Sequence, residues 1–180
     1  VVAGRHSKVT LLESYVSLAS KPHFTNAVTE IVAQEGAQID HYRLLLERPD
    51  AFHVGNTRVY QEAGSTFTST TFALGVALGR NEVHALLDAP NSSCFLSGLY
   101  RTAGAQRIDN HINVDHAKPH TTSRVYYKGI LDGKSRAVFS GRVLIRQNAV
   151  KAQAHQKDYN IILSEGAEID TKPALEIYCD

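Results

Sequence analysis

The sequence contains no methionine and no tryptophan, and cysteine occurs only at Cys94 and Cys179. Two cysteines cannot form a metal-binding framework by themselves and do not require a disulfide, so nothing argues for an oxidising compartment. The expected location is therefore the cytoplasm. Because a translated chain normally starts with methionine and this one starts with Val1, we expect it to be a fragment of a longer protein.

Long apolar runs and an excess of charge of one sign are also missing. Uninterrupted apolar runs span only a few residues, as at 44–46, whereas a membrane-spanning helix needs about 20. No secretory signal opens the chain. Lysine and arginine number 19 against 18 aspartates and glutamates, and no basic block occurs. We therefore expect neither a membrane nor a nucleic acid as a partner.

What the sequence does contain is alternation of apolar and polar residues. Residues 136–146 place one set of side chains on a single face of a strand, namely Ala137, Phe139, Gly141, Val143 and Ile145. Residues 65–72 (STFTSTTF) and 173–179 (PALEIYC) also fit strands. The best helix candidate, residues 26–37, is rich in β-branched residues, which fit a pleated surface better. The chain is therefore predicted to be nearly all β.

Turn-forming residues recur at a long period. Glycines stand at positions 4, 36, 64, 104, 133 and 166, so most of them follow one another at roughly 30 residues, with one longer gap after Gly64. Secondary breaks lie between them, so a turn follows roughly every 15 residues, whereas a β-sandwich turns every 8 to 12. This spacing predicts a parallel β-helix, a solenoid of coils of about 30 residues, in one domain over residues 1–180. The near-identical phrases EGAQID (35–40) and EGAEID (165–170) are expected to mark the same corner on different coils.

Histidines supply the candidate metal chemistry. The segment HINVDHAKPH contains His111, Asp115, His116 and His120, and imidazole and carboxylate ligands suit iron or zinc. In an extended chain, however, His116 and His120 would lie roughly 13 Å apart, so a local site needs a sharp reversal near Pro119. The alternative is a corner whose histidines hydrogen-bond backbone groups.

A second histidine pattern follows the coil period. The four residues His23, His53, His84 and His116 recur at almost the same spacing as the predicted coils. They could therefore stack as a ladder that binds a transition metal or lines an interior path, although nine histidines also make a chance series plausible.

Most of the chain resembles the SufB/SufD family of iron–sulfur cluster assembly proteins, most specifically over its last third, residues 114–180, and it is closer to the SufD branch. The resemblance rests on D-H-x-x-P-H-x-x-S (115–123), YKGILDGKSRAVFSG (127–141), LSEGAEIDTKPALEIY (163–178) and, more weakly, RNEVHALLD (80–88). It implies a right-handed parallel β-helix core, which agrees with the repeat pattern.

The resemblance also implies a role. A SufD-like subunit pairs with a SufB-like subunit and with the ATPase SufC, and ATP hydrolysis remodels that assembly while a nascent cluster forms. Such a subunit is not an enzyme by itself and holds no stable cofactor, although iron or iron–sulfur species can pass through the complex. In the family a Cys/His-containing segment and a helical region that docks the ATPase follow this core, and a helical region precedes it. We expect all three to lie outside these 180 residues.

Candidate site residues follow from the same resemblance. It places the SufB–SufD contact near this end of the β-helix, and an exposed edge strand can pair with a partner's strand. The expected interface residues are Leu175, Glu176, Ile177, Tyr178 and Cys179. The candidates for metal or cluster handling are His116, His120 and Cys179. Cys179 shares a side with Leu175 and Ile177, so it is either a buried structural thiol or a sulfur-handling thiol near the interface. Cys94 is expected to serve packing.

Two other classes of function remain open. A structural solenoid could simply self-associate, for instance as a homodimer. A carbohydrate-active β-helix needs carboxylates that converge in one groove, whereas the acidic residues here are scattered and often lie at turns.

Overall fold

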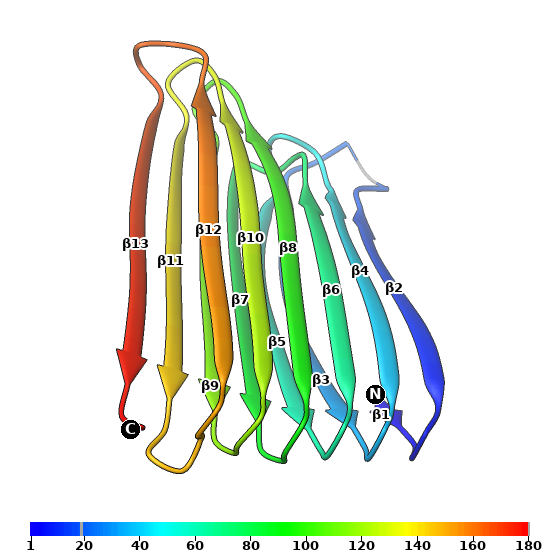
Figure 1. Ribbon diagram of the computed structural model, residues 1–180. Coiled ribbons are helices and arrows are strands. Elements are labelled where there is room, and N and C mark those ends of the chain that lie inside the picture. The colour runs from blue at the N-terminus through cyan, green and yellow to red at the C-terminus, as the bar shows by residue number, and fades with distance from the viewer. Residues whose placement is uncertain (19, 180) are drawn as a thin grey trace.

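The chain folds into a right-handed parallel β-helix (Figure 1). A computed structural model describes residues 1–18 and 20–179, and within these residues every regular element is a strand. The strands are β1 (Val2–Ala3), β2 (Lys8–Val16), β3 (Phe24–Ala33), β4 (Gln38–Leu46), β5 (Phe52–Gln61), β6 (Thr66–Ala73), β7 (Leu78–Leu87), β8 (Ser93–Thr102), β9 (Arg107–His116), β10 (Thr122–Leu131), β11 (Arg136–Ile145), β12 (Gln153–Ile162) and β13 (Glu168–Ile177).

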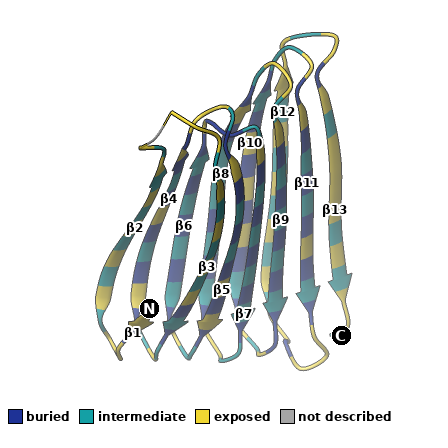
Figure 2. Ribbon diagram, turned by 180° about the vertical axis from the view of Figure 1, so that it is seen from behind, coloured by how far each residue is buried: buried dark blue, intermediate teal, exposed yellow. Residues whose placement is uncertain are grey.

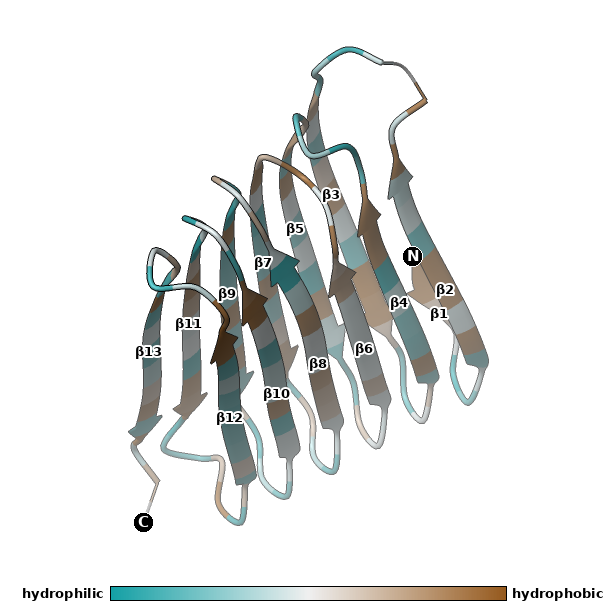
Figure 3. Ribbon diagram, turned by 90° about the horizontal axis from the view of Figure 1, so that it is seen from above, coloured by the Kyte–Doolittle hydropathy of each residue, from teal (hydrophilic) through white to brown (hydrophobic). Residues whose placement is uncertain are grey.

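Odd and even strands form two separate sheets that face each other. The seven-stranded sheet has the order β1-β3-β5-β7-β9-β11-β13, and the six-stranded sheet has the order β12-β10-β8-β6-β4-β2. All pairs are parallel, as in a solenoid in which each coil adds one strand to each sheet. Seen from above, the sheets are two layers joined by short corners (Figure 3). The predicted all-β solenoid is confirmed, and the former helix candidate is β3 followed by a turn.

Coil length varies along the solenoid. One coil leads from Phe52 to its sheet partner Leu78, and a longer one leads from Arg136 to its partner Glu168. The average length is close to the predicted period, but the register shifts from coil to coil.

Side chains that alternate inward fill the space between the sheets. In β11 the five residues predicted to share one face are all buried. The largest buried side chains include Phe67, Tyr100 and Phe139. Burial fades toward both ends of the solenoid, because β2, β12 and β13 have an open side and contain no fully buried residue (Figure 2).

Two kinds of corner join the sheets. We call the turns from an odd strand to the next even strand the odd-to-even corner and the reverse turns the even-to-odd corner. Along the odd-to-even corner one residue per coil adopts a left-handed conformation with φ between 55° and 64°, namely His6, Gly36, Gly64, Asn91, His120 and Lys151. The amide of each of the first five donates a hydrogen bond to the carbonyl of the residue just before its counterpart in the next coil. This backbone ladder fixes the corner independently of side-chain identity.

The two copies of the EGAxID phrase lie at opposite corners, contrary to the prediction. Residues 35–40 run from β3 into β4, whereas residues 165–170 run from β12 into β13. The phrase recurs because both corners need the same local pattern, in which a buried alanine (Ala37 or Ala167) donates its amide back across the turn. The glycines change corner as well: Gly64 lies at the odd-to-even corner and Gly104 at the even-to-odd corner, which explains the unusually long gap between them.

In the described part of the chain no helix is long and apolar enough to cross a lipid bilayer.

Candidate functional site

The solenoid ends in two edge strands, one in each sheet, and each is paired on one side only. β13 is the last strand of the seven-stranded sheet and β12 the last of the six-stranded sheet. On the outer side of each strand the backbone N–H and C=O groups have no neighbouring strand among the described residues, so these edges can accept a further strand.

Large apolar side chains are exposed at this end. On β13 and just beyond it, Leu175 is 57% exposed, Ile177 56% and Tyr178 63%. On β12 and the turn after it the exposed apolar residues are Tyr159, Ile161, Ile162 and Leu163. An apolar rim around open strand edges is a typical protein-binding surface.

The remaining predicted interface residues lie on the same coil. Glu176 receives two hydrogen bonds from Arg142 of β11, at 2.8 and 2.7 Å, and both side chains are solvent-accessible. Cys179 is a free thiol, is half-buried and packs against the core. The structure therefore brings all five residues together at one open end, while their interface role stays a prediction.

His116 points into the solenoid and both of its ring nitrogens are engaged. Its Nδ1 lies 2.7 Å from Thr121 Oγ1, which itself donates to the Lys118 carbonyl, so the ring N–H is the donor in this contact. Its Nε2 lies 2.8 Å from Ser123 Oγ and accepts the hydroxyl proton. Burial lowers the pKa of His116 to about 4, so the ring is neutral near pH 7.

His120 has an exposed side chain, whereas that of His116 is buried. His120 occupies the left-handed position of the odd-to-even corner, with φ of 58°. Its amide donates to the carbonyl of Val150. Within residues 1–18 and 20–179, no three histidine, cysteine, aspartate or glutamate side chains form a group that could hold a metal ion. Metal or cluster handling by His116, His120 and Cys179 stays a prediction.

The prediction that the four coil-spaced histidines stack as a ladder is wrong. His53 pairs with Thr25 and Gly79 in the sheet, and His84 pairs with Arg58 and Asn113. Because the coils that hold these histidines are shorter than the spacing between the histidines, a nearly constant spacing cannot keep them in register.

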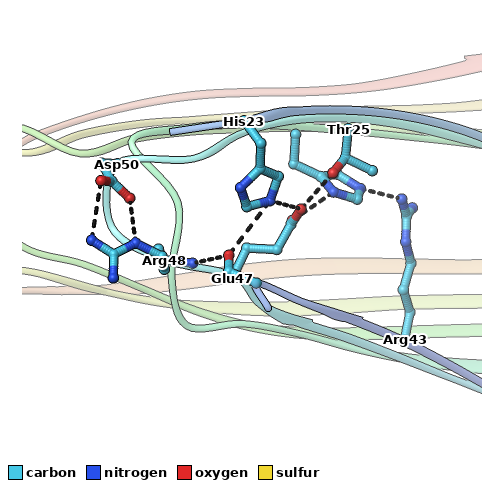
Figure 4. Close-up of polar contacts among 8 residues, drawn as sticks. His23, Thr25, Arg43, Glu47, Arg48 and Asp50 are labelled. Atoms are coloured by element: carbon cyan, nitrogen blue, oxygen red, sulfur yellow. Dashed lines mark hydrogen bonds and ion pairs between the residues drawn. The ribbon is translucent and has the colours of Figure 1, made fainter. Parts of the chain in front are cut away.

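Two of these histidines, His23 and His53, nevertheless meet at the buried carboxylate of Glu47, which Figure 4 shows beside His23. Glu47 follows β4 at the even-to-odd corner and is almost fully buried. Its Oε1 accepts a hydrogen bond of 2.6 Å from Thr25 Oγ1 and lies 3.3 Å from His23 Nε2. Its Oε2 lies 2.7 Å from His53 Nδ1, an electrostatic contact without the alignment of a hydrogen bond.

Arg43 extends this cluster across the interior. Its NH2 donates to His53 Nε2 at 3.0 Å, so that nitrogen carries no proton. Burial and then the charge of Arg43 lower the pKa of His53, which keeps the ring neutral. The Arg43 guanidinium also lies 5.4 Å from the centre of the Tyr15 ring, in a cation–π arrangement. The buried Glu47 and Arg43 charges are thus linked through a neutral imidazole.

A second interior pair lies nearby. His41 Nε2 is 3.0 Å from Glu13 Oε2, and Thr29 donates to the other oxygen of Glu13 at 2.5 Å. Burial alone would raise the pKa of Glu13, but the hydrogen bonds from His41 and Thr29 outweigh it and lower that pKa. These polar side chains occupy inward positions, while outward neighbours such as Leu12 beside Glu13 and Leu44 beside Arg43 are apolar, so alternation of hydropathy assigns them to the wrong face. The coil-spaced histidines were the one available signal.

Comparison with protein-family models shows a match over the whole chain, residues 1–180, to the SufBD core domain of the SUF system of FeS cluster assembly. An iron–sulfur cluster assembly SufBD family protein of Synechocystis is 32% identical over 188 residues, covering 100% of this chain and 42% of that protein. The iron–sulfur cluster assembly protein SufD of Escherichia coli is 32% identical over 174 residues, covering 97% of this chain and 41% of SufD.

A plant protein is also similar. Protein ABCI7, chloroplastic, of Arabidopsis thaliana is 29% identical over 182 residues, covering 100% of this chain and 38% of the plant protein. The chain therefore spans about two fifths of the length of these relatives.

Proposed function

Because the chain belongs to the SufBD core family of iron–sulfur cluster assembly proteins, we propose that it is the β-helix core of a SufD-like subunit whose last coil binds a SufB-like partner. The observation that carries this proposal is the pair of edge strands, β12 and β13, each with one free edge and with apolar residues exposed around them. A partner with the same kind of open end could extend both sheets at once and cover the apolar rim.

In this assembly the protein acts as a binding subunit and not as an enzyme. The ATPase of the SufC type would dock on helical regions outside residues 1–180. Iron and sulfide would be cargo of the complex, with no cofactor held stably by this segment. The cytoplasm is the proposed location, and a plastid is the alternative because one relative carries "chloroplastic" in its name.

A homodimer is the second candidate. The same open end on a second copy could meet the first across a two-fold axis, which would also pair both edges and bury the apolar rim.

The test is an anaerobic pull-down of the full-length protein that carries this core, with a SufB-like partner, followed by iron and sulfide analysis. The variant Ile177→Asp/Tyr178→Asp places charges on the apolar rim and should abolish the complex. The matched control, Leu12→Asp/Val16→Asp, changes two exposed apolar residues of β2 at the opposite end and should retain it. Loss of the complex in both variants, or in neither, would contradict docking through the last coil. Retention of a two-fold self-assembly without the partner would favour the homodimer.

A further inference from the structure

The outer faces of the two sheets differ in charge. On the seven-stranded sheet both signs are mixed and several form ion pairs, such as Arg80–Glu82, Arg136–Glu168 and Arg142–Glu176. On the six-stranded sheet the outward positions of β8, β10 and β12 hold no aspartate or glutamate. In a chain with a net charge of only +1, this separation gives one face a strong positive character.

The cations of this face gather on β10 and β12, in three rows set by the register. Arg124 stands beside His155, Tyr126 beside Lys157, and Lys128 beside Tyr159. We call these six residues the basic face. None of its cations forms an ion pair within the described residues. Arg101 of β8 stands beside Ile130, beyond these three rows, and is not part of the basic face.

A groove crosses the basic face. It has a volume of about 550 Å³ and is bounded by Phe95 and Ser97 of β8, by Arg124 and Tyr126 of β10, and by Lys157 of β12. The groove therefore combines an apolar floor with cationic walls, an arrangement that suits a ligand with both carboxylates and apolar groups. Successive rows are about 6.7 Å apart, which is also the distance between alternate side chains of an extended polypeptide.

The tyrosines argue against a nucleic acid in this groove. Binding of single-stranded nucleic acid uses free aromatic faces on which bases stack. Here the Tyr126 ring contacts the Tyr159 ring, with centroids 5.7 Å apart, and Lys128 Nζ lies 5.5 Å from the Tyr126 centroid. A small anion is also disfavoured, because one layer of side chains would cover only one side of it, whereas small-ligand pockets enclose most of the ligand.

We propose that the basic face is a docking surface for an acidic polypeptide segment with interspersed apolar residues; it lies on the outer surface of the sheet and borders the open end, with which it shares Tyr159 of β12. The carboxylates would meet Arg124, Lys128 and Lys157, and the apolar side chains would lie against Phe95 and Tyr126. The proposal follows from the charge distribution and does not depend on the pairing with a SufB-like subunit.

The test measures fluorescence anisotropy of a labelled peptide of Glu-Asp-Leu repeats with the full-length protein at low salt. The variant Arg124→Glu/Lys128→Glu/Lys157→Glu should weaken binding at least about tenfold. The matched control, Arg58→Glu/Arg107→Glu/Lys172→Glu, makes the same change of charge on the outer face of the other sheet and should leave affinity within about twofold. The double variant Tyr126→Ala/Tyr159→Ala keeps the charge and should also weaken binding.

Three outcomes would overturn the proposal. Equal loss in both charge variants would show nonspecific attraction. Equal binding of a neutral peptide of Gln-Asn-Leu repeats would show that carboxylates are not recognised. Tighter binding of a short oligothymidine, lost in the basic-face variant, would identify a nucleic-acid surface instead.

Discussion

Gly55 shows how a single missing side chain shapes the interior of this protein. A Cβ at this position would overlap the NH2 group of Arg43. The same relation holds for Gly98, which pairs with Tyr127, and for Gly129, which pairs with Tyr100: in both cases a Cβ would overlap the ring. Glycine inside a strand lowers β propensity, so these residues look unfavourable in the sequence and become understandable only beside the large side chains they accommodate.

The first prediction concerns this position. Gly55→Ala should lower the free energy of unfolding by about 2–4 kcal/mol, because the added methyl group displaces the buried Arg43 from His53. Gly4→Ala is the control, since the nearest atom to its added Cβ is 4.0 Å away and the change should cost little. Urea unfolding measures both, and equal stability of the two variants would show that Arg43 is free to move aside.

At the scale of elements, the corners are determined by backbone conformation more than by side chains. The odd-to-even corner uses glycine twice and His6, Asn91, His120 and Lys151 in the other coils, all left-handed. This conformation strains an L-residue by about 1–2 kcal/mol, and the strain is largest for a β-branched residue. Val76 has φ of 65° at the opposite corner, where its fully buried side chain offsets the strain.

His120 tests this interpretation of the corner. The substitution His120→Val should destabilise the protein by about 1–2 kcal/mol, because the exposed side chain gains no burial to offset its strain. By contrast, His120→Gly should change stability by less than about 1 kcal/mol, since relief of strain and the greater entropy of the unfolded chain oppose each other. Thermal unfolding monitored by circular dichroism distinguishes the two. A valine variant as stable as the parent protein would mean that the corner relaxes.

At the scale of the whole molecule, buried neutral histidines couple stability to pH. Burial lowers the pKa of His116 to about 4 and also lowers that of His53, relative to an ordinary value of about 6.5. Below pH 6.5 these histidines are therefore protonated in the unfolded chain but remain neutral in the folded chain. The free energy of unfolding consequently decreases as the pH falls.

The window for His116 runs from about pH 6.5 down to about pH 4, with a loss of about 3 kcal/mol across it. His116→Gln removes this titration, so its stability should depend less steeply on pH in the same window, whatever its stability at pH 7. Urea unfolding between these pH values gives the slope for both proteins. An unchanged slope in the variant would show that His116 is protonated as readily in the folded state as in the unfolded state.

The sequence by itself determined the all-β class, the long repeat period and the inward face of β11, because alternation and turn spacing are local properties of the chain. Its C-terminal motifs indicated the family, and the whole-chain match to the SufBD core confirmed it. The predicted interface residues, Leu175 to Cys179, do lie at an open end of the solenoid, and their role in binding awaits experiment.

Only the tertiary structure decided which residues of different coils meet. Coils of unequal length shift the register, so the four regularly spaced histidines do not stack as a ladder. His23 and His53 meet only because Glu47 contacts both of them. The basic face could not be predicted from the sequence for the same reason, because Arg124, Lys128 and Lys157 become neighbours only through the pairing of β10 with β12. Contacts across a solenoid depend on accumulated coil lengths, and those lengths are set by corners and packing rather than by local pattern.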